Sequence, residues 1–209
     1  MARLLYIEAS PRKERSASIQ VARAFIDEYE RTHPGDAVET VDLWHTSIPE
    51  FDGHVIDSKY AILHGLEHTE EQKRAWRAVE DLISQFTGAD KYVFSLPMWN
   101  FGIPYKLKHY IDVIVQPGYT FSYSPEKGYE GLVTGKPIVS IYASGGAYGP
   151  GTGAESYDLQ KAYLELILGF IGFSDFQKIT IESTLGPQEE KEKNMATALK
   201  QAKTMAVNF

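Results

Sequence analysis

Short runs of branched and aromatic residues recur along the chain, separated by longer stretches in which apolar residues return every three or four positions. Runs of the first kind are typical of buried strands. Four of them lie at Leu4 to Ile7, Tyr92 to Leu96, Ile138 to Ala143 and Phe176 to Ile181. A fifth segment, Ala37 to Leu43, alternates apolar with acidic residues and therefore predicts an edge strand with one solvated face.

Apolar stripes at helical spacing fill the intervals between these strands. They comprise Ile19, Ala22, Ile26 and Tyr29; Trp76, Val79, Leu82, Ile83 and Phe86; Leu159, Ala162, Tyr163, Leu166 and Phe170; and Met195, Ala198, Leu199, Ala202 and Met205. Regular alternation of strand and helix favours a parallel sheet with helices on both faces, because parallel strands need a crossover to return. We predict an α/β fold: one flavodoxin-like, doubly wound domain of five parallel strands over residues 1–209, with insertions near residues 45–65 and 116–135.

The composition excludes several classes of function. The 28 acidic and 21 basic residues leave a net charge of −7, which gives nucleic acid no long-range attraction. The chain has no cysteine, so disulfides and thiolate chemistry are excluded. No apolar run approaches the roughly 18 to 20 residues that cross a bilayer, and the apolar start is interrupted by Glu8. We expect a cytoplasmic protein with no nucleic-acid or membrane partner.

In a doubly wound sheet, ligands bind outside the carboxyl ends of the strands. The loop after the first strand contains Ser10, Arg12, Arg15 and the run Ser16-Ala17-Ser18, which opens a helix. A helix N-terminus presents unpaired N–H groups and the positive end of its dipole, so this loop suits a phosphate monoester. The alternative is that Ser16 only caps the helix and the arginines are solvated.

The loop after the third strand reads Pro97-Met98-Trp99-Asn100-Phe101-Gly102-Ile103-Pro104 and precedes a helix through Ile114. Its prolines and glycine restrict the backbone. Large flat side chains on such a loop suit a planar ring system, with backbone N–H groups free to meet its heteroatoms. The alternative is an aromatic cluster within the core.

The loop after the fourth strand begins Ala143-Ser144-Gly145-Gly146 and continues to Gly153. Paired glycines let the backbone approach a ligand closely. The loop lacks the lysine of a nucleoside-triphosphate loop, and Ser144 lacks the glycine of a nucleophile elbow. A mobile lid or a plain turn is the alternative interpretation.

These three loops together resemble those of the FMN-dependent NADH azoreductase family, also described as NADH:quinone oxidoreductases. The likeness covers nearly the whole chain, and the Met98-Trp99-Asn100-Phe101 stretch before Gly102-Ile103-Pro104 is its most specific part. The chain departs from the family at Trp99, where tyrosine is commoner, and at Ala143, where serine is commoner.

The resemblance implies FMN as cofactor and NADH or NADPH as electron donor, with quinones and azo compounds reduced by two-electron, ping-pong hydride transfer. It implies FMN-binding roles for Ser10, Ser16, Ala17, Ser18, Pro97, Met98, Trp99, Asn100, Phe101, Ala143, Ser144, Gly145 and Gly146. It also implies a homodimer with FMN at the interface, so that Tyr123, with Phe51, forms an aromatic wall for the substrate of a neighbouring site. Because the flavin carries the chemistry, no side chain is assigned as an obligatory catalyst, and no metal is expected.

Three alternatives remain open. The spacing of His64 and His68 around Glu67 matches a helical zinc motif, although Gly65 weakens a helix there. A flavodoxin-like electron carrier or an FMN reductase would use the same fold, and a regulatory relative could have lost turnover altogether.

Overall fold

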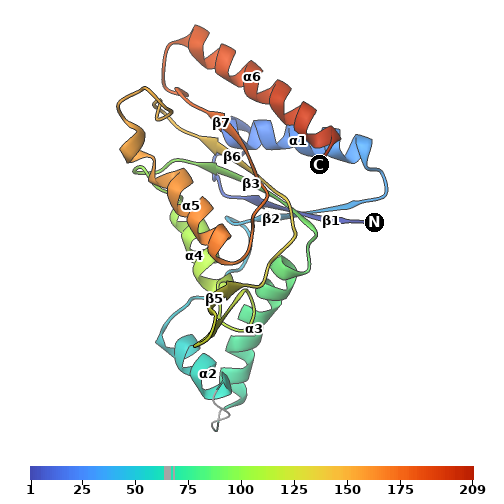
Figure 1. Cartoon of the computed structure of the whole chain (residues 1–209), viewed down its shortest axis with the longest axis vertical. Coiled ribbons are helices and arrows are strands. Elements are labelled where there is room, and N and C mark those ends of the chain that lie inside the picture. Colours follow the sequence, from blue (N-terminus) through green and yellow to red (C-terminus); the bar gives the residue numbers. More distant parts are fainter. Residues whose placement is uncertain (64–66, 68) are drawn as a thin grey trace.

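Five parallel strands form the central sheet, in the order β2-β1-β3-β6-β7 (Figure 1). The structure is a computed structural model that describes residues 1–63, 67 and 69–209. The strands span Arg3–Glu8 (β1), Ala37–Asp42 (β2), Lys91–Pro97 (β3), Ile138–Ala143 (β6) and Phe176–Ile181 (β7). All neighbouring pairs are parallel, which confirms the predicted flavodoxin-like sheet. The chain winds outward from β1 to β2 and then returns to β3, so the switch point lies between β1 and β3.

Helices cover both faces of this sheet (Figure 1). Ala17–Thr32 (α1) and Gln188–Val207 (α6) pack together on one face. Glu70–Thr87 (α3), Tyr105–Ile114 (α4) and Leu159–Phe170 (α5) lie on the other. Successive strand residues point to opposite faces, so the two sides have separate apolar cores. In β1, Leu4 joins the core beneath α1 and α6, whereas Leu5 joins the core beneath α3, α4 and α5.

The first insertion contains a helix that the sequence pattern did not predict. Gly53–Leu63 (α2) packs against α3, with Val55 and Ala61 buried between them. The α3 helix begins at a reciprocal capping box, in which Thr69 and Gln72 bond to each other's backbone N–H groups. The second insertion forms an antiparallel hairpin of Phe121–Ser124 (β4) and Gly128–Gly131 (β5).

The predicted apolar stripe of α5 only partly faces the sheet, because Tyr163 and Phe170 are partly buried against the core while its other members are exposed. The buried positions of this helix are Gln160, Leu164 and Leu168. By contrast, Leu159 and Leu166 of the predicted stripe are 56% and 72% exposed. The helix is apolar on two sides, so periodicity alone could not identify the side that meets the sheet.

Within the described residues, no helix combines the length and apolar character needed to cross a bilayer.

Candidate functional site

Loops from several strands enclose a pocket at the carboxyl edge of the sheet, which we call the phosphate-loop pocket. Its volume is about 440 Å³, within the range of roughly 300–1,000 Å³ that is usual for ligand pockets. The predicted site residues that line it are Ser10, Ser16, Ala17, Pro97, Met98, Trp99, Ala143 and Gly145. The structure therefore brings parts of all three predicted loops together.

The first of these loops ends at Ser16, the N-cap residue of α1. The Ser16 side chain makes no capping bond to the first turn of the helix. Its Oγ lies 3.1 Å from Oγ of Ser18, which is fully buried beneath the loop. The interpretation of Ser16 as an ordinary capping residue is therefore wrong. The N–H groups that open α1 stay available to an anion in the pocket.

Basic side chains surround this end of the pocket. Arg12 and Arg15 line it from the first loop, and Lys191 lines it from the first turn of α6. Glu182, which follows β7, is the acidic residue in the lining. Three cations against one carboxylate, together with the positive end of the α1 dipole, favour a ligand with negative charge.

A network of charged groups holds the loop after β1 against the sheet. Lys13 has a left-handed backbone (φ 48°), and its ammonium group lies 2.5 Å from Oε1 of the buried Glu8. It also pairs with Asp42, the last residue of β2. Burial alone would raise the pKa of Asp42, but hydrogen bonds from Lys13 and His45 lower it overall. Because the lysine and both carboxylates belong to different segments, this network fixes the loop against β1 and β2.

The loop after β3 contains a two-residue turn in a rare backbone conformation. Asn100 and Phe101 both have positive φ, at 48° and 68°. Two reciprocal backbone bonds of 3.0 and 2.9 Å between Trp99 and Gly102 close the turn, which is the pattern of a tight hairpin. The N–H of Asn100 has no partner within the described chain. The turn therefore leaves one backbone donor free.

The loop after β6 is fixed through its carbonyl groups. The carbonyl oxygens of Ser144, Gly145 and Gly146 accept backbone N–H groups from residues 183–185. A Cβ atom at Gly145 would lie 2.8 Å from Cδ1 of Leu185, so a larger residue here would require that leucine side chain to move. The N–H groups of Gly145 and Gly146 form no hydrogen bond to any described residue. This loop thus offers two donors on a braced backbone.

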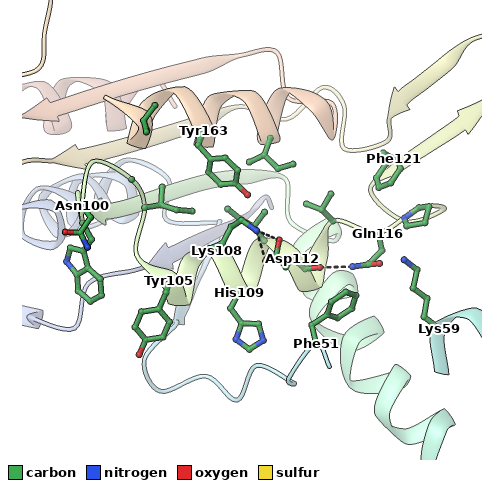
Figure 2. Close-up of a pocket in the computed structure, with 18 residues that line it drawn as sticks. Phe51, Lys59, Asn100, Tyr105, Lys108, His109, Asp112, Gln116, Phe121 and Tyr163 are labelled. Carbon is green, nitrogen blue, oxygen red and sulfur yellow. Dashed lines mark hydrogen bonds and ion pairs between the residues drawn. The ribbon is translucent and has the colours of Figure 1, made fainter. Parts of the chain in front are cut away.

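An open groove of about 1170 Å³ runs along α4 beside the pocket, and we call it the α4 groove (Figure 2). Asn100 lies at one end of the groove, and Lys59 and Phe121 lie at the other. Its walls include Phe51 and the outward side of α5 at Leu159 and Tyr163, so they are largely apolar. His109 lines the groove, with its Nε2 2.9 Å from the carbonyl oxygen of Pro49.

Five of the predicted FMN-binding residues lie outside the phosphate-loop pocket lining. Phe101 is 44% exposed and stacks on Tyr157, with ring centroids 5.1 Å apart. Asn100 lines the α4 groove, Ser18 is buried, and the loop residues Ser144 and Gly146 flank Gly145. Phe51 lines the α4 groove, whereas Tyr123, which was predicted to act at a neighbouring site, is 63% exposed on the β4–β5 hairpin and does not line the groove of its own chain.

Sequence reasoning missed two contributions to the site. The loop after β7 and the start of α6 supply Thr184, Leu185, Lys191 and Met195 to the phosphate-loop pocket. The rule that selected the other loops, proximity to the carboxyl edge, applies equally here and would have found them. The second contribution is Trp44, in the turn after β2, whose ring contacts Trp99.

The histidine pair proposed as a zinc motif, His64 and His68, lies outside the residues that the structure describes. Among the described residues, no group of three or more His, Asp or Glu side chains is arranged to hold a metal ion.

Comparisons with known proteins agree on the fold and on one set of relatives. A family model described as a flavodoxin-like fold matches residues 2–206. An FMN-dependent NADH:quinone oxidoreductase from Desulfotalea psychrophila is 50% identical over 206 residues, which is 99% of this chain and 97% of the relative. A crystal structure of an azoreductase from Bacillus anthracis str. Sterne has a TM-score of 0.92 at 32% identity, covering 100% of both chains. A second B. anthracis structure, of an FMN-dependent NADH-azoreductase in complex with FMN, has a TM-score of 0.88 at 29% identity and covers 99% of this chain and 100% of the other.

The strained turn at Asn100 leads to a prediction about stability. Replacing Asn100 with valine places a β-branched side chain at positive φ, and we expect a loss of about 1–2 kcal/mol in unfolding free energy. Asn100→Gly is the matched control, because glycine accepts this conformation and the side chain is exposed. Urea unfolding of the ligand-free protein measures both. Equal stability of the two variants would contradict the left-handed turn.

Proposed function

The chain belongs to the flavodoxin-like family of FMN-dependent NADH:quinone oxidoreductases, and on that premise we propose that it binds FMN and moves electron pairs from reduced nicotinamide to quinones and azo compounds. The observation that carries this proposal is the convergence of free backbone donors from three loops on one edge of the sheet. The uncapped start of α1, the Asn100 turn and the Gly145-Gly146 pair supply those donors.

The phosphate-loop pocket fits the phosphate end of FMN. The opening N–H groups of α1, with the hydroxyls of Ser10 and Ser16, suit the oxygens of a phosphate monoester. Arg12, Arg15 and Lys191 add positive charge around it. A dianion held in this way needs no metal ion, because the helix dipole and the three cations balance its charge.

The other two loops fit the ring end. Pro97, Met98, Trp99 and Ala143 form an apolar margin of the pocket, which suits a flat ring system. The N–H groups of Asn100, Gly145 and Gly146 are the donors for its heteroatoms. Donors held on a fixed backbone stabilise negative charge without reorganisation when that charge develops.

FMN, when bound, supplies the redox chemistry, because it accepts a hydride from reduced nicotinamide and returns an electron pair to the acceptor. The chain's part is to hold the flat reactants in the α4 groove at reacting distance. We assign no side chain as an obligatory acid or base, since the open groove lets water deliver protons. Donor and acceptor share this space in turn, which gives a ping-pong cycle.

A second copy of the chain completes the site. Tyr123 follows the carboxyl end of α4, whereas the Asn100 turn precedes its amino end. The ten residues of α4 lie between them in the chain, and Tyr123 does not line the α4 groove of its own chain. The exposed apolar side of α5, at Leu159 and Leu166, supports a partner surface here. In this dimer, Tyr123 of each copy serves the site of its partner.

The proposed activity can be tested directly. The purified protein, saturated with FMN, is expected to lose its yellow colour on anaerobic addition of NADH and to oxidise NADH steadily with a benzoquinone or an azo dye. Varying both substrates is expected to give parallel double-reciprocal lines. Turnover that required an added redox protein would indicate an electron carrier, and a protein that failed to bind FMN would overturn the proposal.

The phosphate loop allows a sharper test through Ala17, at the first position of α1. Ala17→Asp adds a carboxylate where phosphate oxygens would lie, and we expect FMN affinity to fall about 100-fold. Riboflavin, which lacks the phosphate, is expected to bind as before. The helix tolerates the change, because acidic residues are favourable at its N-terminus. Ala24→Asp, two turns along α1, is the matched control and is expected to bind FMN normally. Equal losses for FMN and riboflavin would contradict the phosphate assignment.

Mixed dimers test the shared site. Tyr123→Ala leaves the loops of its own chain intact, and Ala17→Asp leaves Tyr123 intact. Each variant alone is expected to have little quinone reductase activity. Mixing them after subunit exchange is expected to restore activity, because one site then combines intact loops with the partner's intact Tyr123. Activity that did not recover, in a mixture shown to contain mixed dimers, would mean that Tyr123 does not act across an interface.

A further inference from the structure

Three aromatic side chains from separate segments meet where the phosphate-loop pocket joins the α4 groove. The Trp44 ring lies 5.8 Å from that of Trp99 and 5.5 Å from that of Tyr105, measured between centroids. The rings of Trp99 and Tyr105 are 6.2 Å apart. All three distances lie within the range of favourable aromatic pairs. We call these residues the Trp44 cluster.

Trp44 is fixed on its other side by two hydrogen bonds. Its indole N–H donates to the carbonyl oxygen of Ala9 at 3.1 Å, and its backbone N–H donates to Oδ1 of Asp42 at 3.0 Å. Ala9 directly precedes Ser10 of the phosphate loop, and Asp42 pairs with Lys13 of that loop. Trp44 therefore connects the segment that holds the phosphate loop with the ring of Trp99.

Trp99 is the residue on which this connection acts. It lines both the phosphate-loop pocket and the α4 groove, so its indole forms part of the boundary between them. Its backbone is held by the bonds to Gly102, while its ring packs against Trp44 and Tyr105. The orientation of the Trp99 ring therefore depends on Trp44, which comes from a different strand loop.

We propose that Trp44 is a positioning residue, which holds the Trp99 ring against the flavin end of the site and couples it to the phosphate loop through Ala9. This role rests on the proposed function, because it concerns how tightly FMN and flat substrates are held. Trp44 itself lines neither the pocket nor the groove, so it acts through Trp99.

The contact can be tested without any ligand. Two indoles at this separation are expected to give a far-ultraviolet exciton couplet in the circular dichroism spectrum of the ligand-free protein. Trp44→Phe and Trp99→Phe are each expected to abolish it. Trp76→Phe is the matched control and is expected to retain the couplet, because Trp76 is the third tryptophan and lies in the core under α3.

The positioning role is tested by a double-mutant cycle on FMN affinity, measured by titrating ligand-free protein and following flavin fluorescence. Trp44→Ala is expected to weaken FMN binding about threefold to tenfold in the native background. The same change in a Trp99→Ala background is expected to have less than about a twofold effect, because its target is gone. Trp44→Phe keeps an aromatic ring at this position and is expected to recover most of the affinity.

Three outcomes would overturn this role. One is a native FMN affinity in Trp44→Ala. Another is an equal loss in both backgrounds, which would mean that Trp44 acts independently of Trp99. Should Trp44→Ala fail to fold in a thermal melt, the cycle is run with Trp44→Leu.

A wild-type protein that binds no FMN would overturn the proposed function as well. A wild-type protein that binds FMN beside an unaffected Trp44 variant would overturn only the positioning role.

Discussion

Parallel pairing of β3 with both β1 and β6 is the constraint from which the site follows. The hydrogen bonds of the sheet continue one residue past the strands, from the Ala9 N–H to the Ser95 oxygen and from the Met98 N–H to the Ala143 oxygen. The position at which each loop leaves the sheet is therefore fixed relative to the neighbouring loop. Parallel strands end at the same edge, so residues as distant in sequence as Ser10, Pro97 and Ala143 line one pocket.

Most of the fold could be predicted because period-two and period-3.6 patterns are strong where one side of an element is buried. All five sheet strands match their apolar runs, and the helices at residues 17–32, 70–87 and 188–207 match their stripes. The α2 helix was not predicted because it begins at Gly53 and packs on another helix rather than on the sheet. The side of α5 that faces the sheet could not be predicted because that helix is apolar on both sides.

The loops carrying the site could be predicted better than the individual contacts within them. Glycines, prolines and serines mark a loop in sequence, but the side chains that support it come from elsewhere. Asp42 ends β2 and Trp44 follows it, at a point where the sequence has no glycine or serine, so only the folded chain reveals their bonds to Lys13 and Ala9. Long-range support of this kind leaves no periodicity, because it depends on strand order rather than on local spacing.

The two cavities meet opposite physical demands. A cofactor that stays bound through many cycles is favoured by a small pocket with many polar donors, and the phosphate-loop pocket has both properties. Substrates that enter and leave at each cycle are favoured by an open apolar surface, on which flat molecules bind weakly and exchange quickly. The α4 groove has that character. Trp99 borders both cavities, so the proposed function requires its ring to remain rigid towards one cavity while reactants exchange in the other. Rigidity there cannot come from the strained turn alone, whose residues Asn100 and Phe101 are exposed. It requires contacts from outside the turn, and Trp44 and Tyr105 supply them.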